Sequence, residues 1–178
     1  MSSSVINNLS CSDKVLKSIL SKPTTFMKLV SESQCASETV EKYVSYHIDN
    51  NRIRQKKGKF RILFSPTLNE SQIDFFELML NPTIKAVVLI LLKSKPLSQI
   101  ELVAITDKSN PSISRALKLL MDKKVIRRVY HAPYSTYSII SKSQLFSYLS
   151  ITNPLIADNF DQFDLCYPKP SIFLNIHN

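Results

Sequence analysis

The sequence predicts a mainly α-helical chain with small β-hairpins, an α+β class, built from two copies of one unit. Three observations lead to this prediction. The chain matches itself without a gap when it is shifted by 73 positions. Apolar residues in each copy recur at helical spacing. Each third helical segment is followed by short runs in which apolar and polar residues alternate, as in a half-exposed strand.

The internal repeat extends over more than 35 residues. The tripeptide SKP occurs at residues 21–23 and again at 94–96. The coinciding apolar pairs include Leu16 with Leu89, Leu29 with Leu102, Val40 with Ile113, Val44 with Leu117, and Ile53 with Ile126. Because self-similarity at a fixed period indicates repeated structural units, we divide the chain accordingly. The predicted parts are a first domain at 10–66, a linker helix at 67–81, a second domain at 82–140, and a C-terminal helix and tail at 141–178.

In the first unit, Val15, Leu16 and Ile19 mark the apolar face of a short helix. A second helix is expected from about residue 25 and a third over about residues 37–50. The runs RIRQK and KFRILFS then predict two strands. Gly58, the single glycine of the chain, lies between them, and we expect it to supply the positive φ of a hairpin turn.

The second unit is predicted to follow the same order. Asn81 is the expected N-cap of a helix that has Pro82 at its first position. LSQIELVAIT predicts the second helix and SNPSISRALKLLMDKK the third. The predicted strands VIRRVYH and STYSII are joined around Ala132 and Pro133.

Two further helices are predicted outside the units. Residues 69–80 place Ile73, Phe76 and Leu80 on one face. This helix links the units or forms a dimer surface, and core packing is the default. Residues 141–151 predict a last helix. The tail after it carries acids and four aromatic residues (Phe160, Phe163, Tyr167 and Phe173), and we expect it to pack back onto the domains or a partner chain.

Composition argues against several chemistries. A phosphate-binding loop, a dinucleotide fingerprint and a nucleophile elbow each need more than one glycine. The cysteines (Cys11, Cys35 and Cys166) are far apart, so we expect neither a disulfide framework nor a zinc site. We therefore predict a protein that is not an enzyme and that holds no cofactor or metal. The sequence has neither an apolar run of membrane-spanning length nor a signal peptide, which predicts a cytoplasmic, nucleoid-associated location without membrane contact.

Positive charge is concentrated in the two units. Residues 10–65 hold 11 Lys and Arg against 5 Asp and Glu, and residues 82–140 hold 10 against 3. An acidic connector (Glu70, Asp74 and Glu77) separates these two blocks. Two basic blocks favour a polyanionic partner such as nucleic acid.

The order helix, helix, turn, helix, hairpin is that of the winged helix-turn-helix. The stretch SKPLSQIELVAITDKSNPSISRALKLLMDKKVIRRV resembles the DNA-binding domain of ArsR- and MarR-type transcriptional regulators, in an archaeal-like form. Ser112, Ile113, Ser114 and Arg115 match the start of the recognition-helix pattern. The first unit matches more loosely, since its third helix carries Glu38 and Glu41 and Asn50–Asn51 stands where the family often has glycine. The resemblance implies two winged helix domains in tandem and double-stranded DNA as the partner.

Candidate contacts follow from this resemblance, because recognition helices read base edges and wings meet phosphates. The recognition-helix candidates are Ser37, Thr39, Lys42 and Tyr43 in the first unit, and Asn110, Ser112, Ser114, Arg115 and Lys118 in the second. The wing candidates are Arg54, Lys56, Lys57, Lys59 and Arg61 in the first unit, and Arg127, Arg128 and His131 in the second. We expect the first wing to contact the DNA phosphate backbone and Arg115 to contribute more of the base recognition.

Other functions stay open at this point. Winged helices also act as protein-interaction modules in transcription or other multi-subunit complexes, and function cannot be read from a fold alone. A ligand-responsive sensor with a pocket between the domains is a third possibility. A homodimer through the linker helix or the last helix is compatible with each reading.

Overall fold

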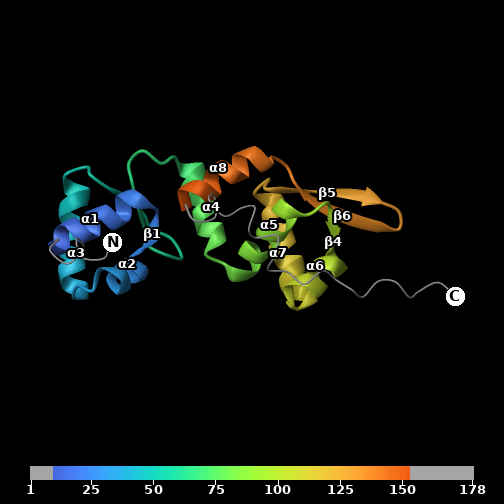
Figure 1. Ribbon diagram of the computed structural model, residues 1–178, viewed down its shortest axis with the longest axis horizontal. Helices are drawn as coiled ribbons and strands as arrows, with labels where there is room; N and C mark the ends of the chain where they lie inside the picture. The colour runs from blue at the N-terminus through green and yellow to red at the C-terminus, as the bar shows by residue number, and fades with distance from the viewer. Residues whose placement is uncertain (1–9, 153–178) are drawn as a thin grey trace, which may run out of the picture.

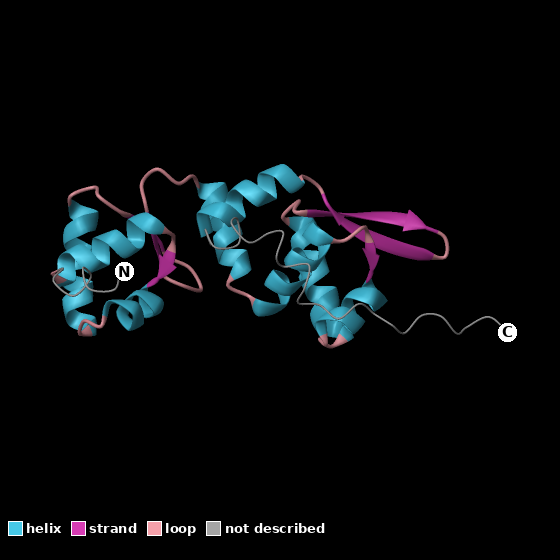
Figure 2. Cartoon of the chain, viewed as in Figure 1, coloured by secondary structure: helices cyan, strands magenta, loops and turns pink. Residues whose placement is uncertain are grey.

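The computed structural model describes residues 10–152 and has an α+β fold with two small three-stranded antiparallel sheets (Figures 1 and 2). The first unit comprises α1 (Cys11–Ser21), β1 (Thr24–Thr25), α2 (Phe26–Ser33), α3 (Ser37–Asp49), β2 (Arg54–Lys56) and β3 (Ile62–Phe64). The second comprises α5 (Pro82–Lys93), β4 (Leu97–Ser98), α6 (Gln99–Thr106), α7 (Asn110–Asp122), β5 (Ile126–His131) and β6 (Tyr134–Ile139). Helix α4 (Glu70–Met79) joins the units, and α8 (Lys142–Thr152) follows the second.

The repeat of the sequence is also a repeat of backbone structure. Helices α2 and α6 begin and end 73 residues apart, and so do α3 and α7. The sheets share one strand order, β1-β3-β2 and β4-β6-β5. Left-handed residues follow the same offset, because Gln34 corresponds to Asp107 and Asn51 to Lys124. Shared bounds and shared turns show that the two units are copies of one local fold.

Matching caps explain why the short second helices start where they do. The Thr25 hydroxyl accepts a hydrogen bond from the backbone N–H of Lys28, and Ser98 accepts one from Glu101. Glu101 also accepts a hydrogen bond from the Ser98 backbone N–H, which completes a capping box. Each helix then ends at a left-handed residue, which turns the chain into the third helix.

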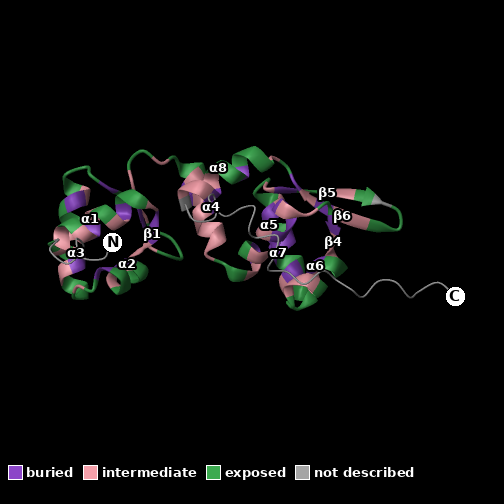
Figure 3. Cartoon of the chain, in the orientation of Figure 1, coloured by how far each residue is buried: buried purple, intermediate pink, exposed green. Residues whose placement is uncertain are grey.

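The hydrophobic cores of the two units differ in size (Figure 3). Seven buried residues form the core of the first unit, and they come from α1, α2, α3, β3 and Ile53. Eighteen form the core of the second. Helix α5 alone contributes six of them, and α4 and α8 add Phe75, Leu145 and Leu149. Since stabilisation scales with buried apolar area, the second unit has the larger hydrophobic contribution.

Helices α4 and α8 confirm the two predicted extra helices and pack within the chain. Ile73 of α4 joins Ile62 and Phe64 of the first sheet in a third, smaller core. On the second unit's side, the ring of Phe75 lies 5.6 Å from that of Tyr148 in α8. The buried apolar faces of α4 and α8 are therefore already covered, and core packing, the default expected for α4, is what the structure shows.

Gly58 does not play the predicted role. Its φ is not positive, and within the described residues the left-handed positions are held by other residue types. A Cβ at Gly58 would instead meet Oε1 of Glu77 in α4 at 3.3 Å. The glycine thus leaves room at the hairpin tip for the Glu77 carboxylate, which binds Lys56.

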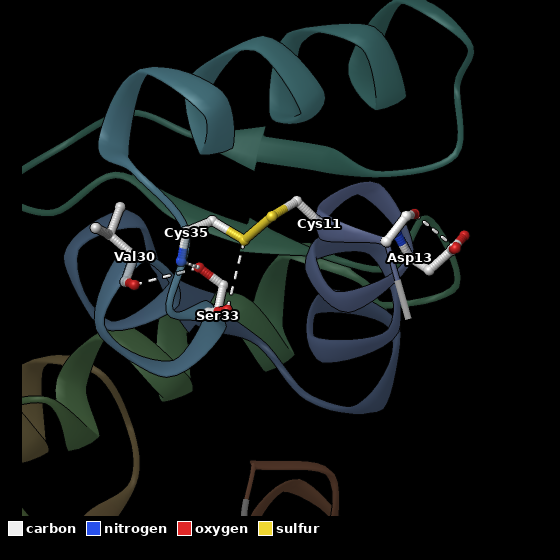
Figure 4. Close-up of a disulfide and its surroundings, with 6 residues drawn as sticks. Cys11, Asp13, Val30, Ser33 and Cys35 are labelled. Carbon is white, nitrogen blue, oxygen red and sulfur yellow. Dashed lines mark hydrogen bonds between the residues drawn. A yellow bond between two sulfur atoms is a disulfide. The ribbon is translucent and has the colours of Figure 1, made fainter. Parts of the chain in front are cut away.

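A disulfide joins Cys11 to Cys35, so the expectation of no disulfide is wrong (Figure 4). Its Cα atoms lie 6.4 Å apart, and the two residues are separated by 24 positions in sequence. The bond ties the first residue of α1 to the turn before α3. This long spacing forms no short cysteine motif, which is why the pattern gave no signal.

Two further expectations concern metals and membranes. Among residues 10–152, no group of three or more His, Cys, Asp or Glu side chains is arranged to hold a metal ion. No single helix in that range has the length and apolar character needed to cross a bilayer, although α4 and α5 pass the test jointly as a pair bent by 106°. The predicted packing of the aromatic tail lies outside the described residues.

Candidate nucleic-acid interface

Helix α7 presents a polar face opposite its buried one. Ile113, Ala116, Leu117 and Leu120 are buried at helical spacing. The exposed face carries Asn110, Ser114, Arg115 and Lys118, whereas Ser112 is half-buried. This is the face on which a recognition helix would carry its base contacts.

Two of the predicted polar contacts on α7 are engaged with neighbouring side chains. The amide of Gln99 in α6 donates to Asn110, and the hydroxyls of Ser109 and Ser112 lie 2.9 Å apart. Within residues 10–152, the side chains of Ser114, Arg115 and Lys118 make no hydrogen bond or ion pair. Of the contacts predicted on α7, these three are therefore the side chains that are exposed and available to a partner.

The β5–β6 hairpin extends well beyond the body of the second unit (Figure 2). Its strands pair in register from Ile126 opposite Ile139 to His131 opposite Tyr134. Arg127 and Arg128 are exposed, and Arg127 donates through Nε to the hydroxyl of Ser138 at 3.3 Å. The hairpin therefore carries two guanidinium groups on an extended, largely solvated ribbon.

Sequence reasoning missed Tyr130 as an interface candidate. It is 69% exposed, and Tyr134 on the other side of the hairpin tip is 64% exposed. The signal was the period-two pattern in RRVYH, which places Tyr130 on the same strand face as Arg128. An aromatic ring beside guanidinium groups suits contact with a sugar–phosphate backbone or with a protein surface.

The exposed cations of the second unit are not neutralised locally. In the part of the chain that the structure describes, no carboxylate oxygen lies within 4.0 Å of Arg115, Lys118, Arg127 or Arg128. Unpaired cations of this kind attract a polyanion over about a Debye length, roughly 8–10 Å at physiological salt.

Helix α3 offers a weaker version of the same face. Ser37 and Lys42 are exposed, Thr39 is half-buried, and Tyr43 packs against the first core. The acids noted in the sequence also matter here, because Glu41 forms an ion pair with Arg61. The α3 face thus combines one free lysine with acidic side chains.

The first hairpin does not present its cations as predicted. Lys56 forms ion pairs with Asp74 and Glu77 of α4, and Arg61 pairs with Glu41. Lys56 and Arg61, two of the wing candidates, are therefore held by carboxylates of the protein, which restricts their reach towards a partner. Lys57 and Lys59 are exposed.

Aromatic rings also hold parts of this hairpin in place. The guanidinium of Arg54 lies 5.8 Å from the centre of the Phe64 ring, and that of Arg61 lies 5.0 Å from the Phe26 ring. Arg61 also donates through Nε to Gln55 at 3.0 Å. Such stacking is favourable for a cation at a protein surface and restricts its reach towards a partner.

The contacts of Lys56 shift its ionisation. Hydrogen bonds to Asp74 and then to Glu77 raise the pKa of Lys56 above its ordinary value of 10.5. Lys56 is therefore fully charged at neutral pH and acts as a clamp between the first hairpin and α4.

A groove of about 460 Å³ lies beside this clamp. The first hairpin contributes Lys59 and Phe60, α4 contributes Leu78, and the end of α7 contributes Leu119 and the following Lys123. The groove shows that the first hairpin lies close to the C-terminal end of α7. The two units therefore approach each other through side chains as well as through the joining helix.

Comparisons with known proteins give little further information. No family model and no curated protein matches the chain. Among solved structures, the DIP2311 protein from Corynebacterium diphtheriae aligns at 13% identity and a TM-score of 0.32. The alignment covers 73% of this chain and spans 26% of that one. A TM-score of this size does not establish a common fold.

Proposed function

We propose that the chain is a double-stranded-DNA-binding transcriptional regulator with two winged helix-turn-helix domains in tandem. The domains are residues 10–66 and 82–140, joined by the linker helix at 67–81 and followed by residues 141–178. In this proposal the protein acts in the cytoplasm on the nucleoid, as a binding protein without catalytic activity.

The observation that carries the proposal is the free positive charge of the second unit. Arg115 and Lys118 on α7, and Arg127 and Arg128 on the β5–β6 hairpin, are exposed and unpaired with carboxylates among the described residues. α7 and β5 are consecutive elements in contact. A helix for the major groove and a cationic ribbon for the adjoining backbone would thus lie on one unit.

The proposal assigns different roles to the two units from those expected from the sequence. The second unit supplies both the reading helix, through Arg115, and the main backbone contacts, through its hairpin. The first unit adds only weaker, secondary contacts through Lys42, Lys57 and Lys59. Lys56 and Arg61 instead hold the first hairpin within the protein.

Fluorescence anisotropy on duplex DNA at several salt concentrations tests the proposal. If about six phosphates are contacted, the log–log plot of affinity against salt should have a slope near −5. Arg115→Ala should relax base preference, whereas Lys95→Ala, an exposed lysine between α5 and β4, is the matched control and should change neither property. Absence of binding to any duplex at low salt would contradict the proposal.

One observation favours a protein-interaction module as the second candidate. The rings of Tyr130 and Tyr134 are exposed at the tip of the long hairpin, and tyrosine is enriched at protein interfaces. Tyr130→Ser with Tyr134→Ser would separate the two functions. DNA binding should change little if the tip serves a protein partner, and should weaken if the rings lie against DNA.

A further inference from the structure

The two units have the same orientation along the molecule. In Figures 1 and 2 the turn before the third helix of each unit, α3 or α7, lies at the bottom of that unit, so both third helices run upward. In each unit the second helix and the first strand lie to the right of the third helix. Both hairpins also project towards the right of the view. The second unit therefore repeats the layout of the first, displaced along the long axis.

This layout excludes a two-fold relation between the units. A two-fold axis along the view would reverse both directions of the picture. A vertical axis would exchange left and right, and a horizontal axis would exchange top and bottom. None of these reversals occurs, so the units are related mainly by a translation along the long axis.

Packing, rather than a flexible tether, holds this arrangement. Lys56 of the first hairpin is bound by Asp74 and Glu77 of α4. The same helix packs Ile73 against the first sheet and Phe75 into the core of the second unit. Because α4 contacts both units through charged and apolar side chains, it fixes the direction in which each unit faces.

We propose that one chain recognises an asymmetric, non-palindromic duplex site, on which both units read in the same direction. This inference rests on the proposed function. Palindromic sites mirror a two-fold relation between reading helices, and the structure has a translation instead. The two halves of the site should also differ in sequence, because Lys42 and Glu41 of α3 stand where α7 has Arg115 and Ser114.

The experiment has two stages and uses the full chain. Binding sites are first selected from a pool of random duplexes. Three probes of equal length are then compared: the selected site, the site with one half inverted in place, and the site with that half replaced. Affinity is measured by anisotropy, and the number of chains on each duplex by analytical ultracentrifugation.

We expect a non-palindromic motif with one chain bound to each duplex. Inverting one half should weaken binding by at least about tenfold, since it replaces several specific base pairs. A palindromic motif that binds two chains would overturn the inference but leave DNA binding intact. An inversion penalty below about twofold would also overturn it. Absence of any selected duplex would instead contradict the proposed function itself.

Variants of the clamp provide a second test. Asp74→Asn with Glu77→Gln releases Lys56 without altering any proposed DNA contact. The ratio of affinities for the original and inverted sites should fall, because the units are then less firmly oriented. A general gain in affinity from the freed lysine would affect both probes and cancel in this ratio. Glu70→Gln, on the same helix and outside the clamp, should leave the ratio unchanged, and an unchanged ratio in the clamp variant would contradict the role of α4.

Discussion

The two hairpins differ in whether their cationic side chains are paired with carboxylates of the protein. In the first unit, Lys56 and Arg61 are bound by carboxylates of α4 and α3. By sheet register, the corresponding residues of the second unit are Val129 and Ser135. Its cations, Arg127 and Arg128, are unpaired with carboxylates in the described range. Part of the most basic run of the sequence therefore forms ion pairs that attach the first hairpin to α3 and α4. A dense charge run is not a reliable sign of a binding surface when acids lie within reach of it.

The two units also differ in the size of their hydrophobic cores. The first unit has the smaller core, and a disulfide between α1 and the turn before α3 (Figure 4). The second unit has Ile84 and Lys108 at the corresponding positions and is covered instead by α4 and α8. A covalent link thus takes the place of packing in the smaller copy.

The largest predicted effect is on the stability of the first unit. Cys11→Ser with Cys35→Ser opens a loop of 24 residues, which should lower the free energy of unfolding by about 3 kcal/mol through chain entropy. Hydrogen exchange should show lost protection in α3 and unchanged protection in α7. Cys166→Ser is the control. Equal loss in both helices would mean that the units unfold together.

A smaller effect on the free energy of unfolding is expected at His47, a buried position at which the two units differ. His47 is 1% exposed, its Nε2 lies 3.2 Å from the Ser12 hydroxyl, and its buried Nδ1 has no hydrogen-bond partner among the described residues. The second unit has Leu120 at this place. His47→Leu should therefore stabilise the protein by about 1 kcal/mol, since it removes a buried unsatisfied group.

The reverse exchange provides the matched comparison. Leu120→His buries an imidazole in an apolar core and should destabilise by about 2 kcal/mol. Urea unfolding measures both variants. If His47→Leu proves destabilising, the bond to Ser12 contributes more than the unpaired nitrogen costs.

The smallest predicted effect concerns the clamp. Lys56→Met should cost about 1 kcal/mol or less at neutral pH, because the side chain is 36% exposed and such pairs are screened by solvent. The pKa of Lys56 is raised on folding, so its contribution is fully present below 10.5 and is lost as pH rises through the higher folded-state value.

Unfolding free energies at about pH 8 and about pH 12 would show this dependence, because lysine titrates between them. The difference between the original protein and Lys56→Met should shrink at the higher pH. Lys57→Met, the neighbouring exposed lysine, should show no such change. A difference that is constant with pH would argue against the ion pairs as its source.

Much of the fold was predictable from the sequence because it depends on local patterns. The 73-residue repeat aligned α2 with α6 and α3 with α7, and the linker and last helices followed from apolar spacing. The clamp between the first hairpin and α4 could not be predicted in this way. Lys56 meets Asp74 and Glu77 only after α4 folds back against the hairpin, 18 and 21 residues further along. The sequence showed the acidic connector and the basic run but not that they touch.

The roles of Gly58 and of the cysteines were missed for a related reason. A glycine between two strands usually indicates a positive φ, whereas here its lack of a side chain matters for the approach to Glu77. Cys11 and Cys35 are brought together by the packing of α1 against α2 and α3. Each of these features depends on tertiary contacts, which no local pattern reports.

The most direct test of the account compares the two hairpins on one duplex. Salt titrations by anisotropy would be run for Arg127→Ala with Arg128→Ala and for Lys57→Ala with Lys59→Ala. Each lost phosphate contact lowers the magnitude of the slope by about 0.9. We predict a reduction of about 2 for the arginine pair and less than about 1 for the lysine pair. A larger reduction for the lysine pair would contradict the claim that the second unit supplies the main DNA contacts.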